Sequence, residues 1–168
     1  MDLYHASQRL HVPGEVIAGR KRELSPEFAR AEARLARYLP PGVVPRTIAV
    51  YAADSAAFAA KYLHAEHADP LKSVCGGESK YLYRVAAERP SGHPMILVSM
   101  AGHARDEEHF AAIAREYWMP TQKWLCREYL CPEFRVVAEE AWPDGGYLAG
   151  AAHMYGLDLA RARRLFLV

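Results

Sequence analysis

The stretch "REYLCPEFRVVAEE", residues 127–140, decides the fold class. It is rich in aromatic and β-branched residues, which favour strands. Cys131-Pro132 interrupts it, because proline has no amide hydrogen to donate to a strand ladder. The stretch therefore predicts a strand that breaks at Pro132 and is followed by a second strand or its own continuation. It begins with Arg127 and Glu128, so a carboxylate leads a segment that heads into the core.

Short strands and helices follow one another irregularly along the rest of the chain. The patterns predict strands over 2–7, 46–53, 80–88 and 94–101, a short extended piece after Pro13-Gly14, and helices over 26–38, 56–66 and 106–118. The helix at 106–118 has Phe110, Ile113, Ala114 and Tyr117 on its apolar face. The tail 156–168 fits a helix or a strand equally well. Elements that do not alternate regularly indicate an α+β fold with an antiparallel or mixed sheet.

Composition narrows the class of protein further. The 168 residues suit a single domain over 1–168, with 51% hydrophobic and 24% charged residues. A formal net charge of +1 provides no strong field to draw the protein onto nucleic acid or an anionic membrane. Three cysteines without a secreted-scaffold spacing suit reduced thiols. We therefore expect a cytoplasmic protein with no membrane segment, or an exported effector without a cleavable signal.

Metal and thiol chemistry have weaker support in the sequence. Cys126 and Cys131 are five residues apart, and His64 and His67 are three apart, so neither pair has the spacing of a structural zinc site. We predict no metal site. Cys75 before Gly76-Gly77 leaves open a reactive thiol, and thus a small α+β enzyme that works through Cys75 or the histidine-rich segments.

Four segments, in their order along the chain, carry a family resemblance. They are "LYHASQRLHVPGEVIAG" (3–19), "RTIAVYAADSAAFAAKYL" (46–63), "KYLYRVAAERP" (80–90) and "EYLCPEFRVVAEE" (128–140). Together they resemble the ADP-ribosyltransferase fold of the His-Tyr-Glu type, including rifampin ADP-ribosyltransferases and related bacterial domains. The resemblance implies an ADP-ribosyltransferase-like split, mixed or antiparallel sheet with flanking helices. It also implies NAD⁺ as co-substrate, with transfer of ADP-ribose to an acceptor and release of nicotinamide.

The resemblance assigns catalytic roles to three residues. His5 would hydrogen-bond a ribose hydroxyl, Tyr51 would stack on the cationic nicotinamide ring, and Glu128 would hold the 2′-hydroxyl and stabilise an oxocarbenium-like transition state. We expect Glu128 beside a cleft and wet enough to stay ionised, with Trp124 and Tyr129 packing beneath it or walling the cleft. The residues expected to contact the dinucleotide are Tyr4, His5, Ala6, Tyr51, Ser55, Tyr62, Tyr81 and Tyr83.

The chain departs from the family pattern at two places. In the rifampin-modifying branch the acidic residue comes earlier, which makes Glu88 or Asp106 an alternative to Glu128. Ala52 follows Tyr51, where relatives often have a second aromatic residue or a threonine. These departures support an alternative, a catalytically decayed binding module of the same fold. Gln122 is a candidate acceptor contact, and the acceptor can be a small molecule, a protein or a nucleic acid.

Overall fold

The computed structural model describes residues 1–21, 24, 26–56, 58–60, 81–124 and 127–141. In this part of the chain seven strands form one sheet in the order β2-β7-β4-β1-β3-β6-β5, and neighbouring strands pair antiparallel. The α+β class with an antiparallel sheet is therefore confirmed. The strands are β1 Leu3–Ser7, β2 Val16–Ala18, β3 Val50–Ala53, β4 Tyr81–Ala86, β5 Ser91–Pro94, β6 Arg127–Cys131 and β7 Glu133–Glu140. The helices with described bounds are α1 Pro26–Ala36, α3 Met95–Gly102 and α4 Glu107–Trp118.

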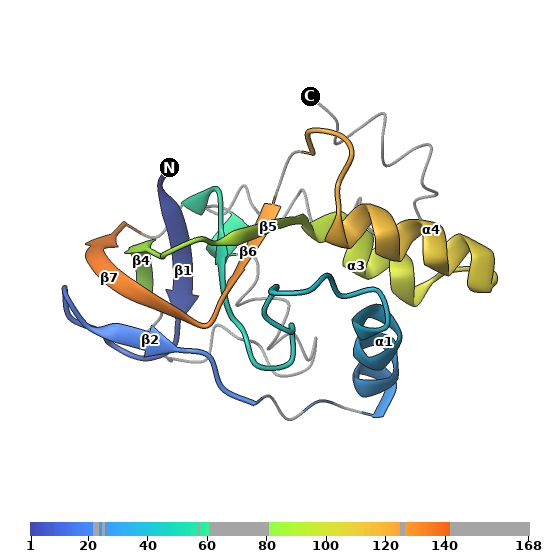
Figure 1. The fold of residues 1–168 in the computed structure, drawn as a ribbon. Helices are drawn as coiled ribbons and strands as arrows, with labels where there is room; N and C mark the ends of the chain where they lie inside the picture. Colours follow the sequence, from blue (N-terminus) through green and yellow to red (C-terminus); the bar gives the residue numbers. More distant parts are fainter. Residues whose placement is uncertain (22–23, 25, 57, 61–80, 125–126, 142–168) are drawn as a thin grey trace.

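Helices α1, α3 and α4 gather beside one end of the sheet (Figure 1). Together with Leu130 of β6 they form an apolar cluster. The apolar face predicted for α4 is confirmed, because Phe110, Ile113, Ala114 and Tyr117 are all 0% exposed. A second apolar cluster lies among β1, β3, β4, β6 and β7 and includes Tyr83, Tyr129 and Phe134. One face of the sheet at β6 thus packs against helices, and the second cluster consists of strand residues.

The segment 94–101 corrects one prediction. It was expected to be a strand, but it forms helix α3, and the strand β5 lies in the preceding "SGHP", where a turn was predicted. A continuous apolar run has no periodicity that separates a buried helix from a buried strand. Packing decides here, because α3 packs against α4 in the cluster that also contains Leu130 of β6, with Ile96 and Leu97 almost fully buried. The predicted strand 46–53 is also shorter, since only Val50–Ala53 is extended.

The break at Pro132 is confirmed. β6 ends at Cys131 and β7 begins at Glu133, and the two strands then join different neighbours. β6 lies between β3 and β5, whereas β7 lies between β2 and β4. One proline thus lets a single apolar stretch supply strands to both halves of the sheet.

Several sequence-based expectations lie outside the described residues. They concern Tyr62, His64, His67, Cys75, Cys126 and the tail 156–168. Within the described part of the chain, no helix is both long and apolar enough to cross a membrane.

Candidate functional site

The sheet opens between β1 and β3. These strands pair at one position only, Tyr4 with Ala53, whereas β1 pairs with β4 along its whole length. At the next position along β1 the imidazole of His5 makes the contact with β3, and its Nδ1 lies 2.7 Å from the carbonyl oxygen of Tyr51. A side chain therefore replaces a ladder hydrogen bond, and the strands separate around it.

A cavity of about 400 Å³ occupies this opening. Four residues that the sequence predicted to contact a dinucleotide line it, namely Tyr4, His5, Ala6 and Tyr51. Arg9 and Arg20 also line it, and Glu15 is the only carboxylate among the described lining residues. The lining is thus net positive, which suits an anionic ligand.

The protonation of His5 follows from its surroundings. Burial lowers the pKa of His5, the hydrogen bond to the Tyr51 carbonyl opposes this, and nearby His11 lowers the pKa further. The imidazole is therefore neutral at pH 7. Since only an N–H can donate to a carbonyl, the proton sits on Nδ1, and Nε2 is a hydrogen-bond acceptor. An acceptor at this position matches a ligand hydroxyl.

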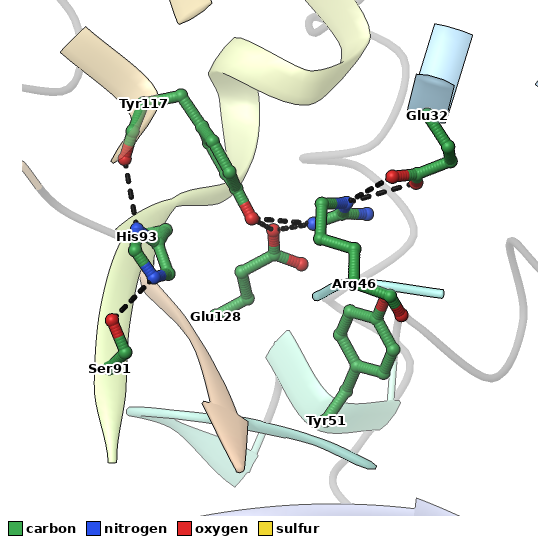
Figure 2. A network of polar contacts seen from close by, with 7 residues as sticks. All are labelled: Glu32, Arg46, Tyr51, Ser91, His93, Tyr117 and Glu128. Atoms are coloured by element: carbon green, nitrogen blue, oxygen red, sulfur yellow. Dashed lines mark hydrogen bonds and ion pairs between the residues drawn. The ribbon is translucent and has the colours of Figure 1, made fainter. Parts of the chain in front are cut away.

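Glu128 does not lie where the sequence suggested. The expectation of a wet carboxylate beside a cleft is wrong, because the Glu128 side chain is 0% exposed and is absent from the described cavity lining. The Arg46 guanidinium forms an ion pair with it, and the Tyr117 hydroxyl donates to its Oε1 at 2.5 Å (Figure 2). The reason is its place in the sheet, since β6 is an interior strand and this face is covered by α3 and α4.

Arg46 is the centre of this buried network. Its Nε donates to both oxygens of Glu32, at 2.9 and 3.1 Å, and its carbonyl oxygen accepts from the Tyr51 hydroxyl at 2.5 Å (Figure 2). Burial lowers the pKa of Arg46, but the charge of Glu128 and the other facing groups raise it well above its ordinary value. Burial also raises the pKa of Tyr117. Arg46 therefore stays charged and Tyr117 stays protonated.

The two faces of the sheet separate the three predicted catalytic side chains. Residues directly opposite in neighbouring strands share a face, and successive residues alternate. Ala53 pairs with Glu128, and Tyr51 is two residues from Ala53, so Tyr51 and Glu128 share the face that the helices cover. His5 is on the other face, where its ring lies 6.0 Å from that of Phe134. Arg46 nevertheless contacts both Tyr51 and Glu128, so these two belong to one polar network.

The remaining candidates have other surroundings. Ser55 accepts from the amide of Phe58 at 3.2 Å, as a helix N-cap does. Tyr81 and Tyr83 share a face, as predicted, with ring centroids 6.3 Å apart, but neither belongs to the described cavity lining. Glu88, Asp106 and Gln122 are exposed, and Asp106 caps α4. Trp124 is buried and donates from Nε1 to Glu116 at 2.8 Å, whereas Tyr129 packs in the cluster on the other face of the sheet.

Sequence reasoning missed the partners of Glu128 and the polar residues after β1. Arg46 is 82 residues from Glu128 in the chain, so no local pattern joins them. The available signal was Glu128 itself, because a carboxylate inside an apolar strand needs a buried cation or hydrogen-bond donors. Arg9, His11, Glu15 and Arg20 flank glycine and proline turns, and only the folding of that loop over β1 brings them to the cavity.

Comparison with known proteins assigns no family. The chain matches no family profile, no curated protein and no solved structure. Among the described residues, no group of three or more His, Cys, Asp and Glu side chains is arranged to hold a metal ion.

Proposed function

We propose that the protein is an NAD⁺-dependent ADP-ribosyltransferase, with a split sheet of the kind the sequence resemblance implies. The observation that carries this is the cavity at the separation of β1 and β3, which His5 and Tyr51 both line. Its volume of about 400 Å³ falls within the range of small-molecule and cofactor sites. Arg9 and Arg20 supply positive charge for the phosphates of a dinucleotide.

The proposed chemistry assigns one role each to His5, Tyr51 and Glu128. His5 offers a neutral Nε2 that can accept from a ribose hydroxyl. Tyr51 is half-buried, and its hydroxyl is fixed on the Arg46 carbonyl, which orients the ring for stacking on nicotinamide. Glu128 has the role of stabilising the cationic sugar. In the structure Arg46 neutralises Glu128, which lies on the sheet face opposite His5. This role therefore requires Arg46 to release the carboxylate and the Glu128 side chain to turn towards the cavity when NAD⁺ binds.

That same ion pair favours a second candidate, a binding module of this fold without catalysis. A carboxylate that is fully buried and paired cannot reach a sugar in the cavity unless the network rearranges. Such a module would bind NAD⁺ through His5 and Tyr51 and leave it intact.

Nicotinamide release separates the two candidates. A transferase incubated with NAD⁺ releases nicotinamide, at least slowly through hydrolysis, and Glu128→Gln lowers the rate by about 10²–10³. His5→Ala weakens NAD⁺ binding, measured as loss of the thermal shift that NAD⁺ induces. A binding module gives a thermal shift without any release. Absence of both would reject the proposal.

A matched series of Glu→Gln variants identifies which carboxylate is the catalytic acid. Glu88→Gln changes an exposed alternative acid, and Glu133→Gln changes an exposed carboxylate on β7 as a control. Each variant is first checked for a native melting transition, because Glu128 is part of the buried network. If Glu88→Gln stops release and Glu128→Gln does not, the catalytic acid is Glu88.

A further inference from the structure

The cavity contains a second polar cluster that the proposed function does not use. Ser7, His11 and Glu15 follow one another at intervals of four residues, and all three line the cavity. Ser7 Oγ lies 3.2 Å from His11 Nε2, and His11 Nδ1 lies 2.7 Å from Glu15 Oε1. A hydroxyl, an imidazole and a carboxylate are thus connected in series.

The hydrogen positions in this cluster follow from its contacts. The hydrogen bond with His11 lowers the pKa of Glu15, so Glu15 is a carboxylate at neutral pH. A carboxylate only accepts, so His11 donates from Nδ1, and in its neutral form its Nε2 accepts the Ser7 hydroxyl. The amide of Arg9 donates to Ser7 Oγ at 3.0 Å, which directs the hydroxyl hydrogen towards His11. This arrangement is the one that activates a serine nucleophile.

The loop that carries the cluster is held in place. The amide of His11 donates to the Tyr83 hydroxyl at 2.9 Å, and the two rings meet edge to face at 5.5 Å. The amide of Val12 donates to Glu15 Oε2 at 3.0 Å. Gly14, whose φ is 89°, donates to the carbonyl of Val136 at 2.8 Å. The three side chains are therefore preorganised before a ligand arrives.

Another serine–histidine pair in the described part of the chain shows what this cluster adds. Ser91 Oγ lies 2.6 Å from His93 Nε2, but His93 Nδ1 faces the carbonyl oxygen of Tyr117 at 3.0 Å. His93 is buried, and neither of these two contacts is a carboxylate that would stabilise an imidazolium. Of these two pairs, the Ser7 pair alone has both a carboxylate partner and a place in the cavity lining.

We propose that Ser7 is a nucleophile for acyl transfer, activated by His11 and Glu15, on esters whose acyl part carries a negative charge. Ser7 Oγ attacks the ester carbonyl carbon while its proton passes to His11 Nε2. The bond to the leaving alkoxide then breaks, and the alkoxide takes that proton. Water hydrolyses the resulting acyl-serine, again through His11, and restores the hydroxyl. Arg9 and Arg20, in the same cavity lining, supply the positive charge for the anionic end of the acyl group.

The first test is covalent labelling of the whole chain with a fluorophosphonate, without NAD⁺. We expect peptide mass spectrometry to find the phosphonyl group on Ser7, with fluoride lost, and Ser7→Ala to remove it. Glu15→Gln slows labelling at least about 10-fold, since the carboxylate orients the imidazole. The Glu15 side chain is 39% exposed, so this variant should fold normally. Ser91→Ala is the matched control and labels Ser7 within about twofold of the wild type.

The second test is hydrolysis of the mono-4-nitrophenyl ester of succinic acid against 4-nitrophenyl acetate. We expect the anionic ester to have the lower KM, and Arg9→Gln to raise that KM by a larger factor than it raises the KM for the acetate. Labelling that survives Ser7→Ala, or that is unchanged by Glu15→Gln, overturns the proposal. So does an equal KM for both esters, because the anionic substrate class would then be wrong. Neither test involves NAD⁺, so their outcome is independent of nicotinamide release.

Discussion

Arg46 determines whether Glu128 can be buried. The guanidinium is 6% exposed and the carboxylate 0%, so loss of one leaves an uncompensated charge in the other. We predict that Arg46→Met lowers the free energy of unfolding by about 3–5 kcal/mol. Urea unfolding followed by tryptophan fluorescence would measure it, since Trp118 and Trp124 lie in the neighbouring core.

Two variants separate this charge effect from simple loss of packing. Glu32 is the other ion-pair partner of Arg46, and its side chain is 12% exposed, more than that of Glu128. Glu32→Gln should therefore lower the free energy of unfolding clearly less than Arg46→Met does. Arg46→Met combined with Glu128→Leu removes both charges and should recover most of the stability. If the double variant is as unstable as Arg46→Met alone, the charge of Glu128 is not the cause.

At this scale the sequence identified the unusual residue but not its surroundings. Glu128 stands out in an apolar strand, and that observation was sound. Its environment depends on Arg46 and Tyr117, which come from other parts of the chain and meet it only in the folded sheet. Long-range pairs of this kind leave no local periodicity.

Elements meet closely where the end of β2 passes the start of β3. A Cβ on Gly19 would lie 2.1 Å from the carbonyl oxygen of Ile48, which is backbone and cannot move aside cheaply. We predict that Gly19→Ala lowers the free energy of unfolding by about 3 kcal/mol or more. Gly102, in the last turn of α3, has nothing within 4 Å of such a Cβ, and Gly102→Ala should be neutral or stabilising by up to about 1 kcal/mol. Equal destabilisation by the two changes would contradict the close contact.

The start of α4 tests the alternative acid. Asp106 accepts from the amide of His109 at 2.7 Å and is exposed, which is the arrangement of an N-cap. Asp106→Ala should cost about 1 kcal/mol of stability, and Asp106→Ser should retain most of it. Thermal unfolding measures both. A loss of nicotinamide release in Asp106→Ala at unchanged stability would instead give this residue a catalytic role.

Elements with a clear period were predicted better than those without one. The face of α4 and the break at Pro132 were correct, because helical spacing and a missing amide hydrogen act locally. The run 94–101 was predicted as a strand, because its apolar residues show no periodicity, whereas packing against α4 selects the helix Met95–Gly102. Strand order was not predictable, since the pairs of β1 with β3 and β4 join residues 49 and 74 to 82 positions apart in the chain.

The stability of the whole molecule depends on pH through two histidines whose pKa is lowered by burial, His93 and His5. Burial lowers the pKa of His93 to about 4, with Arg46 and Arg127 adding to the shift and the Tyr117 carbonyl opposing it. The ordinary value is 6.5, so the unfolded chain binds a proton at a pH where the folded protein does not. Stability from this group is therefore fully present above pH 6.5 and is lost as the pH falls towards 4. Burial also lowers the pKa of His5, which acts in the same direction.

We predict that the free energy of unfolding decreases by about 2 kcal/mol between pH 7 and pH 5 through His93 alone. Urea unfolding at a series of pH values gives the slope. His93→Gln is expected to be less stable at pH 7, because the ring packs 4.9 Å from that of Tyr117, but its slope between pH 7 and pH 5 should be smaller by this amount. The part of the pH dependence that remains in His93→Gln comes from His5 and the other titrating groups. A slope that His93→Gln leaves unchanged would mean that His93 takes up its proton at the same pH in the folded protein as in the unfolded chain, although its side chain is only 1% exposed.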